Sequence, residues 1–270
     1  NKMKFKKKFV IENIKKNPKF SIITVVKNDQ LNISNTIKSI ISQSYKNFEY
    51  IIIDGKSTDK TLIKTLKFKK KINILITEND KGIYYAMNKA IKKAKGEIIV
   101  FVNSGDLLTK NALKYINHIF LKNKNFDFVF GTVKRHYITS TIIKYGVNRN
   151  RLKYNFDFAT SHSAGFFLKS KIFKKYGLFN AQYKCSADYD LYHRLILKHK
   201  IVGGFTKKSN LVGIVKSGGY SSKINFLDHI FEETKIRLNN KQNFIFVLMI
   251  FCNALIKFVL KKIFNTGKKI

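Results

Sequence analysis

Short apolar runs alternate with amphipathic segments along residues 20–130. Runs rich in Ile, Val and Phe that are bounded by polar residues are typical of strands buried on both faces of a sheet. Apolar residues at helical spacing in the intervening segments indicate helices that cover such a sheet. The pattern predicts five strands, at Phe20–Val26, Phe48–Ile53, Ile72–Ile76, Ile98–Val102 and Phe126–Phe130.

Four helices are predicted between these strands, each with its own end signals. Asn32 is a candidate N-cap for a helix that carries Ile33, Ile37, Ile40 and Ile41 on one face. Gly96 stands where a C-cap is expected after the helix that carries Ile83–Ala94. A short helix opens near Thr58, and Thr109 is the expected cap of the helix that carries Leu113–Phe120. Strand and helix alternation of this kind implies βαβ crossovers and a mostly parallel α/β sheet.

Three acidic residues fall at or just after the ends of three successive predicted strands: Asp54, Glu78 and Asp106. In open α/β sheets the ligand binds beyond the carboxyl ends of the strands. Acids at these places favour a ligand site over solvated loops because the chain holds only 16 Asp and Glu residues.

The charge balance is strongly positive: 53 Lys and Arg residues against 16 acids give a net charge of +37. Nucleic-acid binding is disfavoured because only five of the 53 are Arg, the residue that makes bidentate base and phosphate contacts. A codon bias toward Lys, Asn, Ile and Phe explains most of the excess. Two cysteines, Cys185 and Cys252, exclude a disulfide scaffold and a cysteine-based zinc site.

Both ends of the chain combine Lys with apolar residues. Residues 1–19 hold eight Lys and one acid, Glu12, and they lack the long apolar run of a secretory signal. Phe244–Ile256 carries no charge, but Lys257 interrupts the run before it is long enough to span a bilayer. We predict a basic amphipathic arm at 1–19, either solvated or on an anionic surface, and an apolar, basic helix at 241–270 that lies on an anionic membrane. Packing against the body of the protein or a second subunit is the alternative for this helix.

Several ordered motifs carry candidate chemistry. Asp54-Gly55 follows a strand directly, and Lys81 precedes the Ile83 helix, where free backbone amides and a cation suit a diphosphate. Asn103-Ser104-Gly105-Asp106 is a polar stop after a strand, at which a carboxylate suits Mg²⁺ or Mn²⁺. Further segments complete the set: Ser21–Asn28, Gln43-Ser44-Tyr45, Ala86–Lys89, Gly177–Asn180 and Ala187–Leu191 with Arg194.

In their order and spacing, these segments resemble the inverting family 2 glycosyltransferases with the GT-A fold, over roughly residues 20–235. The nearest likeness is to bacterial enzymes that build surface polysaccharides such as colanic acid, O-antigen or capsule. The resemblance implies a Rossmann-like, mostly parallel sheet flanked by helices at 20–240, followed by a C-terminal helical extension.

The resemblance also implies roles position by position. Thr24 and Asp54 match positions that line the nucleotide base, Lys81 and Asn103 match positions near the nucleotide, and Asp106 matches the metal-binding acid of the family. Family members commonly have Asp where Gly105 stands, so Asp106 is the one side-chain carboxylate left in that motif.

Asp188 matches the catalytic base, which must take a proton from a sugar hydroxyl during attack. Asp190 is its rival; on a helix the two side chains point about 200° apart, so only one of them faces the cleft. His162 matches a polar position that contacts the acceptor or a phosphate, and Gly218–Ser221 matches a loop over the donor, although a loop histidine and a plain turn are the alternatives.

We therefore expect an inverting glycosyltransferase that uses a nucleotide-sugar donor, UDP-linked in the first instance, and a divalent cation. Its acceptor is a glycan or lipid-linked glycan, at the cytoplasmic face of the bacterial plasma membrane and in peripheral contact with anionic lipid. Two alternatives stay open: a non-catalytic membrane or polyanion-binding protein on a decayed transferase fold, and a nucleic-acid binder. The segment from Arg135 to Phe158 is expected to shape the pocket that selects the sugar.

Overall fold

The computed structural model describes residues 9–13, 15, 17–137, 140–154, 163–216 and 224–266. Its larger sheet has eight strands in the order β1-β4-β3-β2-β5-β10-β7-β11. These are β1 (Phe9–Glu12), β2 (Phe20–Val26), β3 (Phe48–Asp54), β4 (Ile74–Thr77), β5 (Ile98–Phe101), β7 (Phe128–Phe130), β10 (Phe166–Lys169) and β11 (Gly203–Phe205). A smaller sheet has the order β6-β12-β8-β9. It consists of β6 (Leu107–Leu108), β8 (Thr132–His136), β9 (Thr141–Lys144) and β12 (Leu211–Lys216).

The centre of the larger sheet is parallel. β2 pairs in parallel with β3 and β5, and β3 pairs in parallel with β4. β10 is antiparallel to both β5 and β7 and so reverses direction in the middle of the sheet. All seven residues of β2 are buried because helices cover both sheet faces. The carboxyl ends of β2, β3 and β5 therefore meet at one edge.

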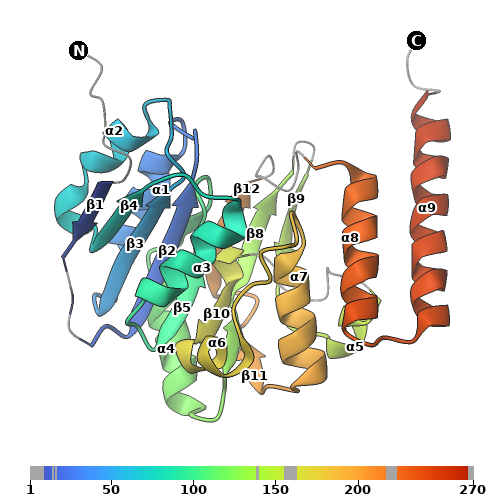
Figure 1. Cartoon of the computed structure of the whole chain (residues 1–270). Helices are drawn as coiled ribbons and strands as arrows, with labels where there is room; N and C mark the ends of the chain where they lie inside the picture. Colours follow the sequence, from blue (N-terminus) through green and yellow to red (C-terminus); the bar gives the residue numbers. More distant parts are fainter. Residues whose placement is uncertain are drawn as a thin grey trace.

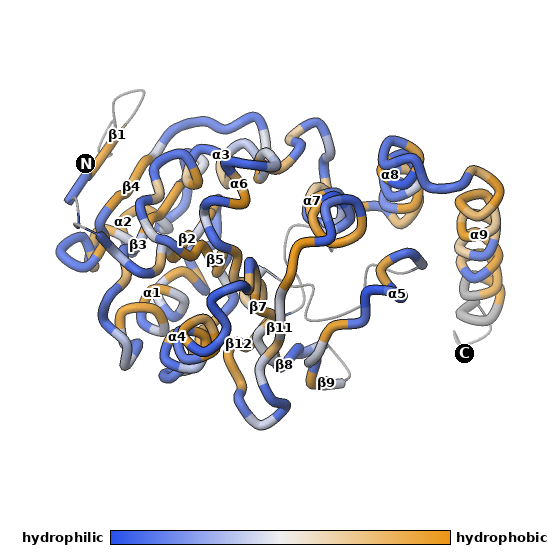
Figure 2. Tube along the Cα trace, turned by 90° about the horizontal axis from the view of Figure 1, so that it is seen from below, coloured by the Kyte–Doolittle hydropathy of each residue, from blue (hydrophilic) through white to orange (hydrophobic). Residues whose placement is uncertain are grey.

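Helices form a layer on each face of this sheet (Figures 1 and 2). Ile22 and Ile52 pack on the layer of α1 (Ile33–Ile41), α2 (Thr61–Leu66) and α4 (Ala112–Lys122). Ile23 and Ile53 point to the opposite layer, as strand alternation requires. That layer contains α3 (Ile83–Lys93), α6 (Ser170–Tyr176) and α7 (Ala187–Tyr192), which continues into the π-helical segment η3 (His193–Lys198). Short helical segments complete this part: η1 (Lys69–Lys71), α5 (Arg149–Leu152) and η2 (Ser163–Gly165).

The predicted α/β architecture is confirmed, and β2 and α1 have the predicted bounds. Two of the predicted helix caps, Gly96 and Thr109, are wrong. α3 ends at a C-cap at Ala94, and Gly96 lies farther on, where a Cβ atom would come within 2.4 Å of the Ser21 backbone nitrogen. This glycine therefore permits a close backbone approach. α4 is capped at Asn111, and the Thr109 hydroxyl donates instead to the Leu211 carbonyl at 2.6 Å.

The described part of the predicted N-terminal arm contains a strand. Phe9–Glu12 forms the edge strand β1, which pairs antiparallel with β4 from Phe9 opposite Thr77 to Glu12 opposite Ile74. The Lys93 ammonium lies 2.9 Å from the Glu12 carboxylate and ties the strand to α3. The apolar residues of this segment thus extend the sheet.

Two helices follow the body of the domain. α8 (Phe226–Asn239) packs on α7, and α9 (Phe244–Thr266) stands outermost beside α8 (Figure 1). Ring contacts join α8 and α9: Phe226 stacks on Phe258 with centroids 4.8 Å apart, and Phe231 meets Phe251 at 5.6 Å. Among the described residues, no helix has the length and apolar character needed to cross a membrane.

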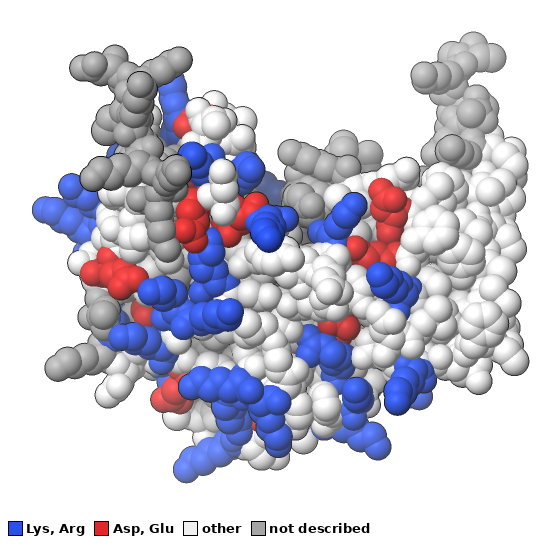
Figure 3. All heavy atoms as spheres, in the orientation of Figure 1, with Lys and Arg blue, Asp and Glu red and all other residues white. Residues whose placement is uncertain are grey.

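The outer face of α9 is apolar. Its large exposed side chains lie at helical spacing along one stripe: Phe244, Ile245, Leu248, Met249, Ile256, Val259, Leu260 and Ile263. In Figure 3 the surface over α9 is almost free of charge, whereas Lys and Arg side chains cover much of the remaining face. A contiguous exposed apolar surface of this kind marks an interaction site.

Candidate active site

A cleft of about 1140 Å³ opens where the parallel strands end. One side of it is lined by the end of β2 and the residues after it (Val25–Asp29), by Gly55 after β3 and by the loop Asn103–Asp106 after β5. α7 and α8 line the opposite side through Asp188, His229 and Glu233, among other residues. The two halves of the chain thus face each other across one cavity, as expected for a ligand at the carboxyl ends of parallel strands.

The loop Asn103–Asp106 is held in place from α1 and from the end of β2. The Thr36 hydroxyl accepts the Gly105 amide at 3.0 Å and donates to the Asp106 carbonyl at 2.9 Å. The Ser104 hydroxyl donates to the Asp29 carboxylate at 2.6 Å. These bonds, together with the bond from the Asp106 amide to the Asn103 carbonyl at 3.0 Å, fix the direction of this short loop.

The Asp106 carboxylate is 5% exposed and lies at the floor of the cleft. Burial raises its pKa to about 8, against the lowering effects of the Lys216 backbone amide, the Arg135 charge and the Ser163 hydroxyl. A buried carboxylate with so high a pKa is one that a cation would stabilise in its ionised form.

The oxygen donors beside Asp106 fit Mg²⁺ or Mn²⁺. The Asn103 side-chain oxygen is buried and has no hydrogen-bond partner among the described residues, although its amide nitrogen donates to Ser163 at 3.3 Å. Mg²⁺ is usually held by one or two carboxylates, and substrate phosphates and waters complete its shell. No group of three or more His, Cys, Asp or Glu side chains stands ready for a metal in the described parts of the chain. Asp106 and Asn103 would therefore share such a cation with the diphosphate.

Gly105 has a backbone φ of +99°, and an added Cβ would meet no atom within 4 Å. The position has space for a side chain, but its left-handed backbone favours glycine.

Lys81 lines the cleft, as predicted, from the loop before α3. The Lys89 ammonium of α3 anchors that loop through ion pairs with Glu78 and with Asp80, the latter at 2.5 Å. Glu78 is therefore part of the loop's anchor. The loop presents Lys81, which is exposed, toward the same cavity as Asp106.

Asp188 lies on the first turn of α7 and lines the cleft. Its carboxylate accepts the Tyr189 amide at 3.0 Å, and the Tyr84 hydroxyl lies 3.3 Å away. Burial raises the pKa of Asp188 to about 6; the bonds from Tyr189 and Tyr84 lower it, and the charge of Glu233 raises it further. A base of this pKa is ionised at neutral pH and close to optimal for accepting a proton.

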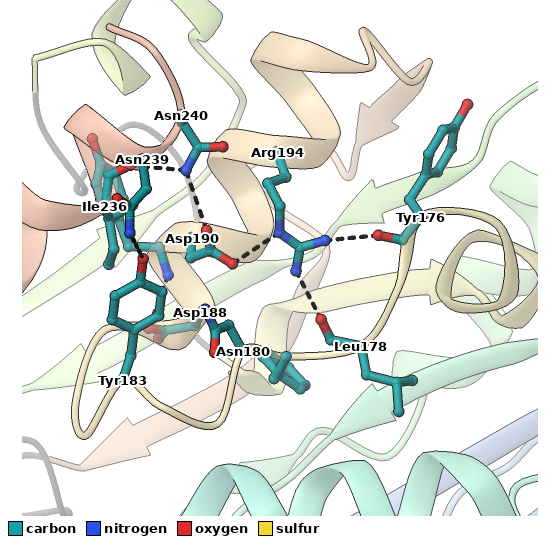
Figure 4. A network of polar contacts seen from close by, with 12 residues as sticks. Tyr176, Leu178, Asn180, Tyr183, Asp188, Asp190, Arg194, Ile236, Asn239 and Asn240 are labelled. Carbon is teal, nitrogen blue, oxygen red and sulfur yellow. Dashed lines mark hydrogen bonds and ion pairs between the residues drawn. The ribbon is translucent and has the colours of Figure 1, made fainter.

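Asp190, the rival candidate, is not among the residues that line the cleft, and its carboxylate points toward Arg194 and Asn240 (Figure 4). It is 4% exposed, and its carboxylate accepts Arg194 Nε at 2.8 Å and Asn240 Nδ2 at 3.2 Å. Arg194 also donates to the carbonyls of Tyr176 and Leu178. The structure gives no support to Asp190 as the base or as a substrate contact, because its carboxylate pairs with Arg194 of the same helix, which in turn holds the loop after α6, and with Asn240 just after α8.

Sequence comparison decides which family this arrangement belongs to. The model for "Glycosyl transferase family 2" matches residues 21–188, which include the strand ends, the Asn103–Asp106 loop and Asp188. The chain belongs to glycosyl transferase family 2. The resemblance predicted from the motifs is therefore confirmed.

Relatives of this family 2 chain are bacterial glycosyltransferases. The UDP-Glc:alpha-D-GlcNAc-diphosphoundecaprenol beta-1,3-glucosyltransferase WfgD of Escherichia coli is 38% identical over 112 residues, which are 41% of this chain and 44% of that protein. The putative teichuronic acid biosynthesis glycosyltransferase TuaG of Bacillus subtilis is 34% identical over 100 residues, or 36% and 40% of the two chains. The matched segments thus span less than half the length of each relative.

The solved structures confirm the GT-A fold. Residues 1–349 of TarS from S. aureus in complex with UDP match with a TM-score of 0.65 and 19% identity, over 88% of this chain and 70% of that one. At this identity the likeness shows the fold alone.

The resemblance assigns Thr24 and Asp54 to contacts with the nucleotide base, but the structure gives both side chains other partners. Thr24 is fully buried; its hydroxyl donates to the Val102 carbonyl at 2.7 Å and lies 3.0 Å from the Tyr50 hydroxyl. It points into the core beneath the cleft, so the expected contact of Thr24 with a base is not supported. Asp54 ends β3 beside the cleft, and its carboxylate accepts the Ser57 hydroxyl at 2.5 Å and the Ser57 amide. In this arrangement Asp54 orders the turn after β3, while Gly55 forms the cleft surface.

His162 and the loop Gly218–Ser221 lie outside the described residues, so their predicted roles stay predictions. The expectation that the segment from Arg135 shapes the pocket agrees with its described part, since Arg135 and Tyr137 line the cleft.

Sequence reasoning missed the contribution of α8. His229 and Glu233 are one helical turn apart and line the cleft opposite the strand ends. Glu232 turns to the other side and accepts hydrogen bonds from the amides of Cys185 and Ser186, both at 2.8 Å. The i, i+4 spacing of His229 and Glu233 was visible in the sequence, but nothing local indicated that this helix would face Asp188.

Proposed function

We propose that this chain is an inverting glycosyltransferase that transfers a sugar from a nucleotide-sugar donor to a glycan or lipid-linked glycan. The observation that carries the proposal is the position of Asp188. Its carboxylate, with a pKa raised to about 6, lines the same cleft as Lys81 and the Asn103–Asp106 loop. A base and a diphosphate site that share one cavity are what direct displacement at an anomeric carbon requires.

Asp188 is the proton acceptor in this mechanism. The acceptor hydroxyl enters from the side of the cleft lined by α8 and gives its proton to the Asp188 carboxylate as its oxygen bonds to the anomeric carbon. The bond between that carbon and the donor phosphate oxygen breaks, and its electron pair leaves with the nucleoside diphosphate. Attack from the face opposite the leaving group inverts the anomeric centre.

The leaving diphosphate lies at the other end of the cleft. Lys81 contributes positive charge there. Asp106 and Asn103 would hold a Mg²⁺ or Mn²⁺ ion, which neutralises charge on the diphosphate when it is bound. UDP-sugars are the first donors to test because the E. coli relative is named for UDP-Glc and because TarS of the same fold has been crystallised with UDP.

Surface-polysaccharide synthesis at the cytoplasmic face of the bacterial plasma membrane is the setting we propose. The names of WfgD and TuaG point to lipid-linked and cell-wall glycans. The exposed apolar stripe of α9 suits peripheral contact with an anionic membrane, and the same helix carries the exposed Lys257. Nucleic acid is not a proposed partner.

A donor screen tests the proposal. Wild type and Asp188→Asn are incubated with UDP-, GDP- and dTDP-sugars and a lipid-linked acceptor, and the release of nucleoside diphosphate is measured. The acceptor is α-N-acetylglucosaminyl diphosphate on a short alkyl chain. Binding of each donor to each protein is measured separately by calorimetry. We expect at least one donor to bind both proteins alike and to be turned over in the presence of wild type alone. If no donor binds wild type, the chain is a non-catalytic protein on a decayed transferase fold.

A further inference from the structure

Arg135 extends into the diphosphate end of the cleft from the smaller sheet. It lies on β8, and the pairing of β8 with β12 puts Arg135 opposite Val215, on the sheet face that also carries Val133. Val133, Val215 and Ala164 form a small buried cluster on that face, beside Ser163. Arg135 is thus held by a packed strand, and its charge is close enough to lower the pKa of Asp106.

Contacts within the protein orient the guanidinium of Arg135 without using all of its N–H donors. It lies over the Tyr137 ring, 4.9 Å from the ring centroid, and Tyr137 also lines the cleft. The Nε atom is buried and has no hydrogen-bond partner in the described part of the chain. An aromatic ring that supports a guanidinium limits its rotation and leaves its N–H groups for a ligand.

Other arginines of the chain differ from Arg135 in their contacts. Only five of the 53 cationic residues are Arg. Arg149, Arg194 and Arg237 each donate to backbone carbonyls, so their guanidinium groups hold loops in place. Arg135 differs because it faces the cavity in which Asp106 and Asn103 lie.

We propose that Arg135 binds the donor diphosphate directly. The proposal rests on the proposed function, since it assigns a residue to the phosphate end of the donor site. A guanidinium presents paired N–H donors that match two phosphate oxygens. Gly105 leaves Asp106 as the single carboxylate for a cation at this place, and Arg135 adds a fixed positive charge beside it. Part of the affinity for the diphosphate is then independent of the metal.

Calorimetry with UDP and uridine isolates this contact. In EDTA, wild type binds UDP at least tenfold more tightly than uridine, a difference of about 1.4 kcal/mol. Arg135→Gln reduces the UDP-to-uridine ratio to less than threefold, and Arg135→Lys gives an intermediate ratio because an ammonium cannot make the paired contact. Lys134→Gln is the matched control: it removes one charge from the adjacent residue of β8, whose side chain points to the other sheet face. Thermal melting of all four proteins establishes that each is folded.

A double mutant separates direct binding from neutralisation of Asp106. If Arg135 contacts phosphate, Arg135→Gln weakens UDP binding in EDTA to the same extent in an Asp106→Asn background. If its effect on UDP disappears in that background, or if Arg135→Gln behaves as Lys134→Gln does, the inference is wrong. Repeating the titration with GDP and dTDP tests the case in which the protein prefers a nucleotide base other than uracil. If none of the three nucleotides binds wild type, with Mn²⁺ or with EDTA, the proposed function fails before Arg135 is tested, and the inference fails with it.

Discussion

The Glu232 carboxylate accepts the backbone amide of Ser186 at 2.8 Å, two residues before Asp188. The same carboxylate accepts the Cys185 amide and the Cys185 thiol, at 2.8 and 3.0 Å. Burial alone would raise the pKa of Glu232, but these bonds lower it below its ordinary value. A carboxylate on α8 thus holds the segment from which α7 and its candidate base begin.

Removing this carboxylate should impair both stability and turnover. Glu232→Gln removes the charge from several hydrogen bonds, and bonds to charged groups contribute about 1.5–3 kcal/mol. We expect a loss of about 2 kcal/mol in urea unfolding and a fall of about tenfold in kcat, with little change in the donor KM, since α7 carries the base and not the diphosphate site. Asp228→Asn, an equal charge change at an exposed position of α8, is the control. Equal kcat values in the two variants would contradict the positioning role.

The pH profile should report the ionisation of Asp188. The base acts in its ionised form, so kcat/KM should decrease tenfold per pH unit below about pH 6 and level off above it. Glu233→Gln removes a charge that raises the pKa of Asp188 and should shift this limb to lower pH. Tyr84→Phe removes a bond that lowers the pKa and should shift it to higher pH. Shifts of the same sign in both variants would argue that another group controls the limb.

Chelation should suppress turnover. With Asp106 as the single carboxylate at the expected cation site, EDTA should reduce the transfer rate at least tenfold, and added Mn²⁺ should restore it. Asp106→Asn should need a higher Mn²⁺ concentration for half-maximal activity than wild type. A transfer rate unaffected by EDTA would show that this chain works without a divalent cation.

The pair Asp190 and Arg194 should be structural. Both side chains are largely buried, and removing one partner of such a pair leaves an uncompensated charge, at a cost of about 3–5 kcal/mol. We expect Asp190→Asn to lower the urea midpoint strongly and to leave the donor Kd of the folded protein unchanged. Arg151→Gln, at an exposed arginine, should leave the urea midpoint unchanged. A stable Asp190→Asn protein with impaired donor binding would return Asp190 to the active site.

The α9 stripe should determine membrane binding. Replacing Ile245, Met249 and Ile256 by Ser removes three exposed apolar side chains and should weaken sedimentation with phosphatidylglycerol vesicles at least tenfold. Ile63→Ser combined with Leu121→Ser removes exposed apolar residues elsewhere and serves as the control. If the triple variant still binds these vesicles but has lost self-association in ultracentrifugation, a second copy covers the stripe.

Local patterns located the parallel half of the fold well, since β2 is defined by a run of apolar residues and α1 by apolar residues at helical spacing. The resemblance to the family favoured Asp188 over Asp190, and helical geometry added that only one of the two side chains could face the cleft; Asp188 lines it, whereas Asp190 pairs with Arg194. Thr24 illustrates the limit of such arguments: its strand was predicted correctly, but Tyr50 and Val102 determine that its hydroxyl lies in the core. Arg135 and Glu232 reach the cleft and α7 through tertiary packing, for which periodicity carries no signal.

The match to the family ends at Asp188, whereas α8, which forms the opposite wall of the cleft, begins at Phe226. Donor handling and the far wall are therefore encoded in separate stretches of the chain. Substitutions in α8 can reshape the proposed entrance for an incoming glycan without touching the strand ends of the proposed nucleotide site. Grafting residues 226–239 from a relative, with Glu232 kept because it holds the segment before α7, offers a route to a new acceptor while the activated sugar stays the same.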